Sequence, residues 1–111
     1  MIHPRPWYEV EIIVPRAITA LDGYPAGSVF DVVTQDGWKF SCSTNGDYGK
    51  NFRSNSDLKI LGKWIKGSME NAGVLKIGSP ITKDTLDAFG KHFLCLTKTT
   101  INNLWILEMV K

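Results

Sequence analysis

Short stretches rich in β-branched and aromatic residues recur along the chain, and this recurrence most restricts its possible folds. Stretches of this kind, bounded by glycine, proline or asparagine, are typical of β-strands. The dipeptide Asp36-Gly37 is a strong hairpin signal, and Asn102-Asn103 is the expected turn before the last strand. The expected strands cover residues 7–14, 28–35, 38–44, 74–78, 92–98 and 104–110.

Two further stretches have the character of helices, at residues 56–73 and 82–90. In the first, Ser56 is the expected N-cap. Gly62 and Gly67 would each weaken the helix by up to about 1 kcal/mol, so either a neighbour packs closely or the helix is shorter. Many short strands with only two helices predict a small, mostly-β barrel rather than a parallel α/β sheet.

Length and composition point to one ordinary globular domain over residues 1–111. Hydrophobic residues make up 43% of the chain and charged residues 22%, values that do not favour disorder. No apolar run approaches the ~18–20 residues needed to cross a bilayer. The first residues lack the apolar core of a signal peptide, so a cytoplasmic location is expected.

The sequence offers little that an enzyme would need. Cys42 and Cys95 lie in apolar strand patterns and are expected to be buried free thiols. Together with His3 and His92 they have no metal-ligand spacing. No glycine-rich phosphate loop or nucleophile elbow occurs, so we expect no catalytic residue, metal or cofactor.

Charge is unevenly distributed along the chain. Residues 1–49 contain three basic and six acidic side chains, whereas residues 50–66 contain five basic and one acidic. This basic block is either a surface that faces an anion or a solvated helix face.

The stretch GDYGKNFRSN (46–55), expected to be a loop, combines the groups that contact nucleic acids. Arginine and lysine bind phosphates or guanine edges, and asparagine can pair with adenine. Phe52 either packs on DNA or anchors the loop to the core. The candidate DNA-binding residues, taken together with the family resemblance below, are Arg16, Asn45, Asp47, Tyr48, Lys50, Asn51, Arg53, Ser54 and Asn55.

The sequence also resembles a known family. GKWIKGSMENAGVLKIGSPI (62–81) is similar to the signature of plant B-three DNA-binding domains, although Ser79 stands where aspartate is usual. A wider set of strings resembles the C-terminal recognition domain of NgoFVII-type restriction endonucleases: PRPWYEV (4–10), DGWKF (36–40), GDYGKNFRS (46–54), DLKILGKWIKG (57–67) and WILEM (105–109).

This resemblance implies a seven-stranded open pseudobarrel with two short helices. It implies that two arms clamp the major groove of DNA, a first arm at residues 15–27, with Arg16 its only cation, and a second arm at 43–55. In that family a phospholipase-D-like nuclease domain precedes the recognition domain. No His-x-Lys motif of that nuclease is present in this chain.

The resulting hypothesis is sequence-specific binding of double-stranded DNA through the major groove, without catalysis. It leaves the DNA target open. Three alternatives remain: a barrel that stacks single-stranded nucleic acid on exposed aromatics, a protein-interaction module using the basic block, and a subunit completed by a separate nuclease chain.

Overall fold

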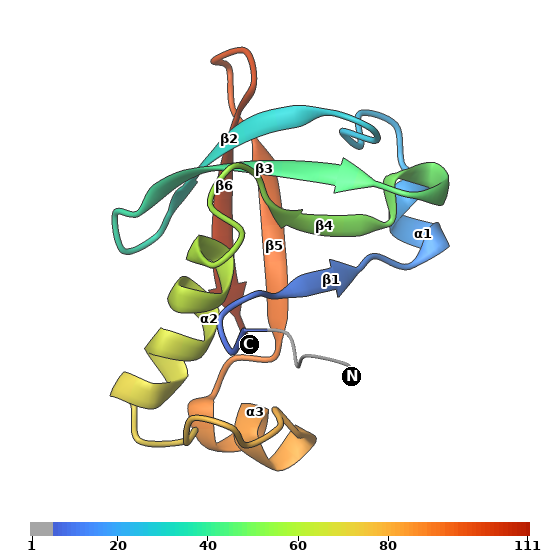
Figure 1. Cartoon of the computed structure of the whole chain (residues 1–111). Coiled ribbons are helices and arrows are strands. Elements are labelled where there is room, and N and C mark those ends of the chain that lie inside the picture. The colour runs from blue at the N-terminus through green and yellow to red at the C-terminus, as the bar shows by residue number, and fades with distance from the viewer. Residues whose placement is uncertain (1–5) are drawn as a thin grey trace.

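The computed structural model describes residues 6–111 and has one curled, six-stranded sheet with the order β1-β4-β3-β2-β6-β5 (Figure 1). All neighbouring strands are antiparallel except β2 and β6, which are parallel. The strands are β1 (Glu11–Ile13), β2 (Val29–Thr34), β3 (Lys39–Asn45), β4 (Asn51–Ser54), β5 (Phe93–Lys98) and β6 (Leu104–Val110).

The helices are short and lie around the ends of the half-barrel (Figure 1). They are α1 (Arg16–Thr19), the 3₁₀ turn η1 (Asp47–Gly49), α2 (Ile60–Asn71) and α3 (Lys83–Phe89). The architecture confirms the mostly-β open pseudobarrel that the sequence predicts, with six strands in the described residues rather than seven. No helix in this part of the chain combines the length and apolar character needed to cross a bilayer.

The core lies on the concave side of the sheet, with α2 at one end. Trp64 on α2 is fully buried, and its ring tilts against Phe40 with centroids 6.5 Å apart. The Trp64 indole N–H also donates a 2.8 Å hydrogen bond to Asp36, which ties the β2–β3 hairpin to the helix. The remaining buried apolar residues are Phe30, Val32, Cys42, Phe52, Leu61, Ile65, Met69, Leu75, Leu107 and Met109.

Three predicted elements need correction. The strand expected at 7–14 is reduced to β1, because the segment before it packs on α2 instead of pairing. The strand expected at 74–78 is not a strand: a C-terminal helix cap and a turn occupy it, with Leu75 buried and Ile77 exposed. The loop expected at 46–55 ends in strand β4, which pairs with both β1 and β3.

Helix α2 is shorter than the sequence pattern indicates. It begins at Ile60, and Ser56 is not its N-cap, because Ser56 has a left-handed backbone with φ 68°. Its end is as expected: Gly73 has φ 77°, and the Val74 N–H donates to the Met69 carbonyl at 3.0 Å, a Schellman cap.

Gly62 allows the N-terminal segment to cross α2. A Cβ at this position would lie 1.8 Å from the Tyr8 carbonyl oxygen, whereas Gly67 has no neighbouring atom within 4 Å. Glu70 then holds the crossing segment, since it accepts hydrogen bonds from the Trp7 indole at 3.1 Å and the Tyr8 hydroxyl at 2.8 Å.

The two cysteines differ in their surroundings. Cys42 is a fully buried free thiol, as predicted, and burial raises its pKa to about 12. Cys95 is also free but exposed, so the prediction that it is buried is wrong. The reason is that β5 is an edge strand, and most of its side chains are exposed.

Candidate nucleic-acid interface

The two arms lie against each other at one end of the half-barrel (Figure 1). The Tyr24 hydroxyl of the first arm donates a 2.6 Å hydrogen bond to the Gly49 carbonyl of the second. The Thr44 hydroxyl, which is buried, donates to the Pro25 carbonyl at 2.5 Å. At the base of the first arm, the Val14 N–H donates a 2.8 Å hydrogen bond to the Lys50 backbone carbonyl. The arms therefore form one continuous surface.

Close backbone packing adds to these hydrogen bonds. Gly49 is buried with φ 71°, and a Cβ there would lie 2.7 Å from Ala26 Cα. Only glycine satisfies both requirements, because the position needs a left-handed backbone and has no room for a side chain. Gly49 therefore lets one arm approach the other closely.

Arg16 and Tyr48 bring the cation of the first arm onto the aromatic ring of the second. The Arg16 guanidinium carbon lies 4.1 Å from the Tyr48 ring centroid, within range of a cation–π interaction. Tyr48 is 64% exposed and has φ 61°, an unusual conformation for a bulky side chain. An exposed aromatic held in a strained turn is a feature found often at binding sites.

The outer face of β3 and β4 continues this surface with polar side chains. Asn45 is the cross-strand partner of Asn51, and Ser43 is the partner of Arg53. Asn55 follows on the same side, with its N–H bonded to the Ser41 carbonyl at 2.8 Å. Asn45 and Arg53 are exposed, while Asn51 and Asn55 are partly buried.

The inner face of β4 belongs to the core. Phe52 is 5% exposed, so it is an anchor rather than a surface aromatic. Ser54 is 0% exposed, and its hydroxyl accepts a 3.4 Å hydrogen bond from the Leu61 N–H at the start of α2. Ser54 thus does not reach the surface with the other candidates, and we leave it out of the interface. Asp47, in η1, is exposed beside Tyr48.

The cations of the basic block at 50–66 are divided among several elements. Lys50 and Arg53 lie on the second arm, whereas Lys59 and Lys63 lie at α2. Lys66 is held by the N-terminal segment, where its amine donates to the Trp7 carbonyl at 2.7 Å and lies 3.8 Å from the Trp7 ring centroid.

The cations of the arms are not neutralised by carboxylates. In residues 6–111, ion pairs within 4.0 Å involve only Asp87, which contacts Lys83 and His92. Glu11 faces Arg53 across the β1–β4 ladder without such a pair. A small hollow of about 20 Å³ beside Arg53 is lined by Glu9 and Glu11, so the surface is mixed in charge rather than uniformly positive.

Asn51 has an unmet hydrogen-bonding requirement. Its Oδ1 is the only buried side-chain nitrogen or oxygen in the described residues that lacks a hydrogen-bond partner. Its amide packs against Gly46, where a Cβ would lie 2.9 Å from Nδ2. Glycine at 46 therefore gives the Asn51 side chain its space on the hairpin.

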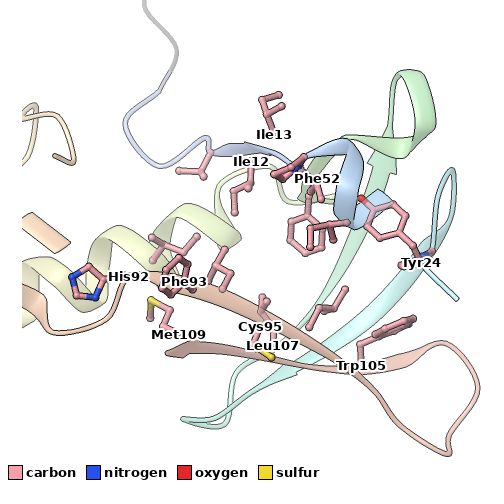
Figure 2. A pocket seen from close by; sticks show the side chains of 18 of the residues that line it. Ile12, Ile13, Tyr24, Phe52, His92, Phe93, Cys95, Trp105, Leu107 and Met109 are labelled. Carbon is pink, nitrogen blue, oxygen red and sulfur yellow. The ribbon is translucent and has the colours of Figure 1, made fainter. Parts of the chain in front are cut away.

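A larger cavity was not predicted from the sequence, and its lining includes residues of the first arm such as Ile18 and Tyr24. This apolar trough of about 910 Å³ is lined by residues of both edge strands, β1 and β5. Figure 2 shows side chains that line it. Tyr24 and Trp105 lie toward one end, and His92 and Phe93 toward the other. The apolar pattern around Cys95 predicts burial and so gives no sign of an open trough beside β5.

No group of three or more His, Cys, Asp or Glu side chains that could hold a metal ion occurs in residues 6–111. His92 is instead paired with Asp87, whose carboxylate oxygen lies 2.7 Å from Nε2. His3 lies outside the described residues.

Comparison with known proteins supports a nucleic-acid interface. No curated protein matches the chain. The family model described as the NgoFVII C-terminal B3-like DNA-binding domain matches residues 2–100, a match that includes both arms, all of α2 and α3, and strands β1 to β5. The curled six-stranded sheet agrees with the B3-like pseudobarrel, and the chain belongs to the family of NgoFVII C-terminal B3-like DNA-binding domains.

Proposed function

We propose that this domain binds double-stranded DNA in a sequence-specific manner by inserting its two joined arms into the major groove. The observation that carries the proposal is the pairing of Arg16 with Tyr48 at 4.1 Å, beside the exposed Lys50 and Arg53. These side chains come from both arms, and all of them lie within the residues that the family model matches.

The shape of the second arm supports the major groove as the docking site. β3 and β4 form an antiparallel hairpin whose outer edges pair with β2 and β1, so the part offered to the major groove, about 12 Å wide, is the tip of the hairpin at η1. The outer face of the hairpin presents the exposed Asn45 and Arg53, whose side chains can form hydrogen bonds with base edges, and the partly buried Asn51 lies opposite Asn45. Lys50 and Arg16 are placed to contact phosphates, which supply affinity but little sequence information.

Acidic residues near the arms favour sequence specificity over general attraction to phosphates. Glu11 faces Arg53 across the sheet, and Asp47 is exposed beside Tyr48. These carboxylates lower the non-specific affinity for a polyanion, and Asp47 can accept a hydrogen bond from a cytosine amino group. Discrimination between sequences then depends on a few base contacts.

We propose that the domain is not catalytic by itself. In the NgoFVII-type arrangement that the sequence resembles, cleavage would come from a phospholipase-D-like nuclease domain or a separate nuclease chain. Co-purification of the tagged domain from its native source, followed by mass spectrometry, tests for such a partner.

In vitro selection from a randomised duplex library tests the DNA-binding proposal. We expect a defined consensus, and a Kd for the selected duplex that rises steeply with salt as counterions are released. Anisotropy measurements with the selected duplex, a scrambled duplex and each single strand of the selected duplex complete the test. Equal affinity for both duplexes would show that binding is not sequence-specific. Tighter binding of single strands would favour a surface at Tyr48 that stacks with bases.

A further inference from the structure

We propose that the two arms act as one rigid arm unit and that Tyr24, which is not among the proposed DNA-contacting residues, is the positioning residue that holds them together. This inference rests on the proposed function, since it concerns how the same surface is organised. It differs from two arms that close independently around DNA.

Tyr24 acts on the second arm at its tightest point. Its hydroxyl donates to the carbonyl of Gly49, the residue between Tyr48 and Lys50. Fixing this carbonyl fixes the peptide that carries both neighbouring side chains. Tyr24 is partly buried, and Figure 2 shows it at one end of the trough. Because the ring is packed there, the position of its hydroxyl is restricted.

The hydroxyl of Tyr24 stays a donor over the whole working range of pH. Burial raises the pKa of Tyr24 above its usual value of 10.0, so the group does not ionise near neutrality. The hydrogen bond at 2.6 Å is therefore a constant feature of the arms and not a pH-dependent one.

Two further contacts restrict the movement of one arm relative to the other. Ala26 lies against Gly49 with no room for a side chain, as shown by the 2.7 Å separation from a Cβ at that position. Thr44 donates to the Pro25 carbonyl and accepts a 3.4 Å hydrogen bond from the Ser28 N–H. The first arm is thus attached to the second on both sides of Ala26.

The physical consequence is preorganisation. Arg16 belongs to the same arm as Tyr24, so the ties that locate Gly49 also locate the Arg16–Tyr48 pair. Ordering loops during binding costs free energy, and a surface that is already ordered avoids that cost. The benefit is largest where several side chains must meet defined base edges, and smallest for diffuse phosphate contact.

Tyr24→Phe tests the inference, because it removes only the hydroxyl. Loss of one such hydrogen bond is expected to weaken binding of the selected duplex by about 2- to 10-fold. Binding of a scrambled duplex should stay within about 2-fold, because phosphate contacts tolerate misplacement. Tyr8→Phe is the matched control: it removes a tyrosine hydroxyl that donates to Glu70 at 2.8 Å, away from the arms.

A second variant tests whether one of the two hydroxyl hydrogen bonds is enough to hold the arms together. Thr44→Val in the Tyr24→Phe background removes both hydroxyl hydrogen bonds between the arms, and hydrogen exchange at residues 46–50 should become faster. The thermal midpoint, measured in parallel, reports the loss of overall stability expected from the groups left unpaired at Pro25 and Ser28. The inference is overturned if this double variant binds the selected duplex as the wild type does, or if affinities for both duplexes fall equally. Failure of the wild type to bind any duplex would instead overturn the proposed function.

Discussion

The guanidinium carbon of Arg16 lies 4.1 Å from the centroid of the Tyr48 ring, so the first helix of the chain and the turn after β3 share one surface. Each residue alone would be an ordinary exposed side chain. Together they form a cation on an aromatic platform, and the left-handed backbone of Tyr48 shows that the turn keeps this arrangement despite conformational strain.

Tyr48→Gly should separate function from stability. Glycine relieves the positive φ of 61°, a gain of about 1 kcal/mol, and loses an exposed cation–π contact of similar size. We therefore expect a thermal midpoint close to that of the wild type but weaker binding of the selected duplex. Differential scanning fluorimetry and anisotropy measure the two effects. A variant that binds DNA normally would show that the aromatic ring is not part of the interface.

Arg53→Ala should weaken binding of the selected duplex by about 1–3 kcal/mol if the guanidinium contacts a base edge. It should also relax the preference at one position of the consensus. Lys76→Ala, an exposed cation in the connection between α2 and α3, is the control for a general loss of positive charge. Equal effects of both substitutions would mean that Arg53 contributes charge alone.

Much of the half-barrel could be predicted because its signals are local. The Asp36-Gly37 turn lies between two clear strand patterns, and the structure places a hairpin there with the Thr34 hydroxyl bonded to Asp36 at 2.6 Å. Strand β4 was not predicted because Phe52 is its one apolar residue. Its inner and outer positions alternate in burial, but the sequence has no alternation of apolar and polar residues to indicate this.

The candidate site could be predicted only in part. Residue types indicated the second arm, and the family resemblance indicated the first, but neither could show that Tyr24 bonds to Gly49. Contacts between residues distant in sequence depend on the packing of the whole sheet. The same holds for Cys95, whose apolar surroundings in the sequence indicated burial, whereas its place on an edge strand leaves it exposed.

Gly62→Ala and Gly67→Ala should change stability in opposite directions, although both replace a glycine of α2. At Gly62 the new Cβ would lie 1.8 Å from the Tyr8 carbonyl, so we expect a loss of about 1–3 kcal/mol or more. At Gly67 there is open space, and alanine should add up to about 1 kcal/mol through helix propensity. Urea unfolding monitored by tryptophan fluorescence measures both. Similar effects at the two positions would contradict the packing of the N-terminal segment on α2.

Asp36 should contribute to stability in a pH-dependent way. Burial alone would raise its pKa, but hydrogen bonds from Thr34, Trp64 and its own backbone outweigh burial and hold the pKa below the usual 3.8. A depressed pKa means that the stabilisation is present above about pH 4 and is lost as pH falls through the folded-state value.

The variant Asp36→Asn tests this dependence, because it keeps the shape and removes the charge. Thermal midpoints between pH 7 and pH 2.5 should fall less steeply for Asp36→Asn than for the wild type. Asp22→Asn, at an exposed loop position, serves as the control and should leave the slope unchanged. Parallel curves for Asp36→Asn and the wild type would show that this carboxylate does not stabilise the hairpin through its charge.

The two cysteines should differ sharply in reactivity. The thiolate is the reactive form, and burial raises the pKa of Cys42 to about 12, so this thiol is both inaccessible and protonated at pH 8. Cys95 is exposed on the edge strand β5. A chromogenic disulfide reagent should therefore titrate one thiol rapidly in the native protein and the second only after unfolding in denaturant. Cys95→Ser should abolish the rapid phase, and Cys42→Ala should leave it intact. Rapid titration of both thiols in the native wild type would mean that the core beneath β3 opens far more readily than its packing indicates.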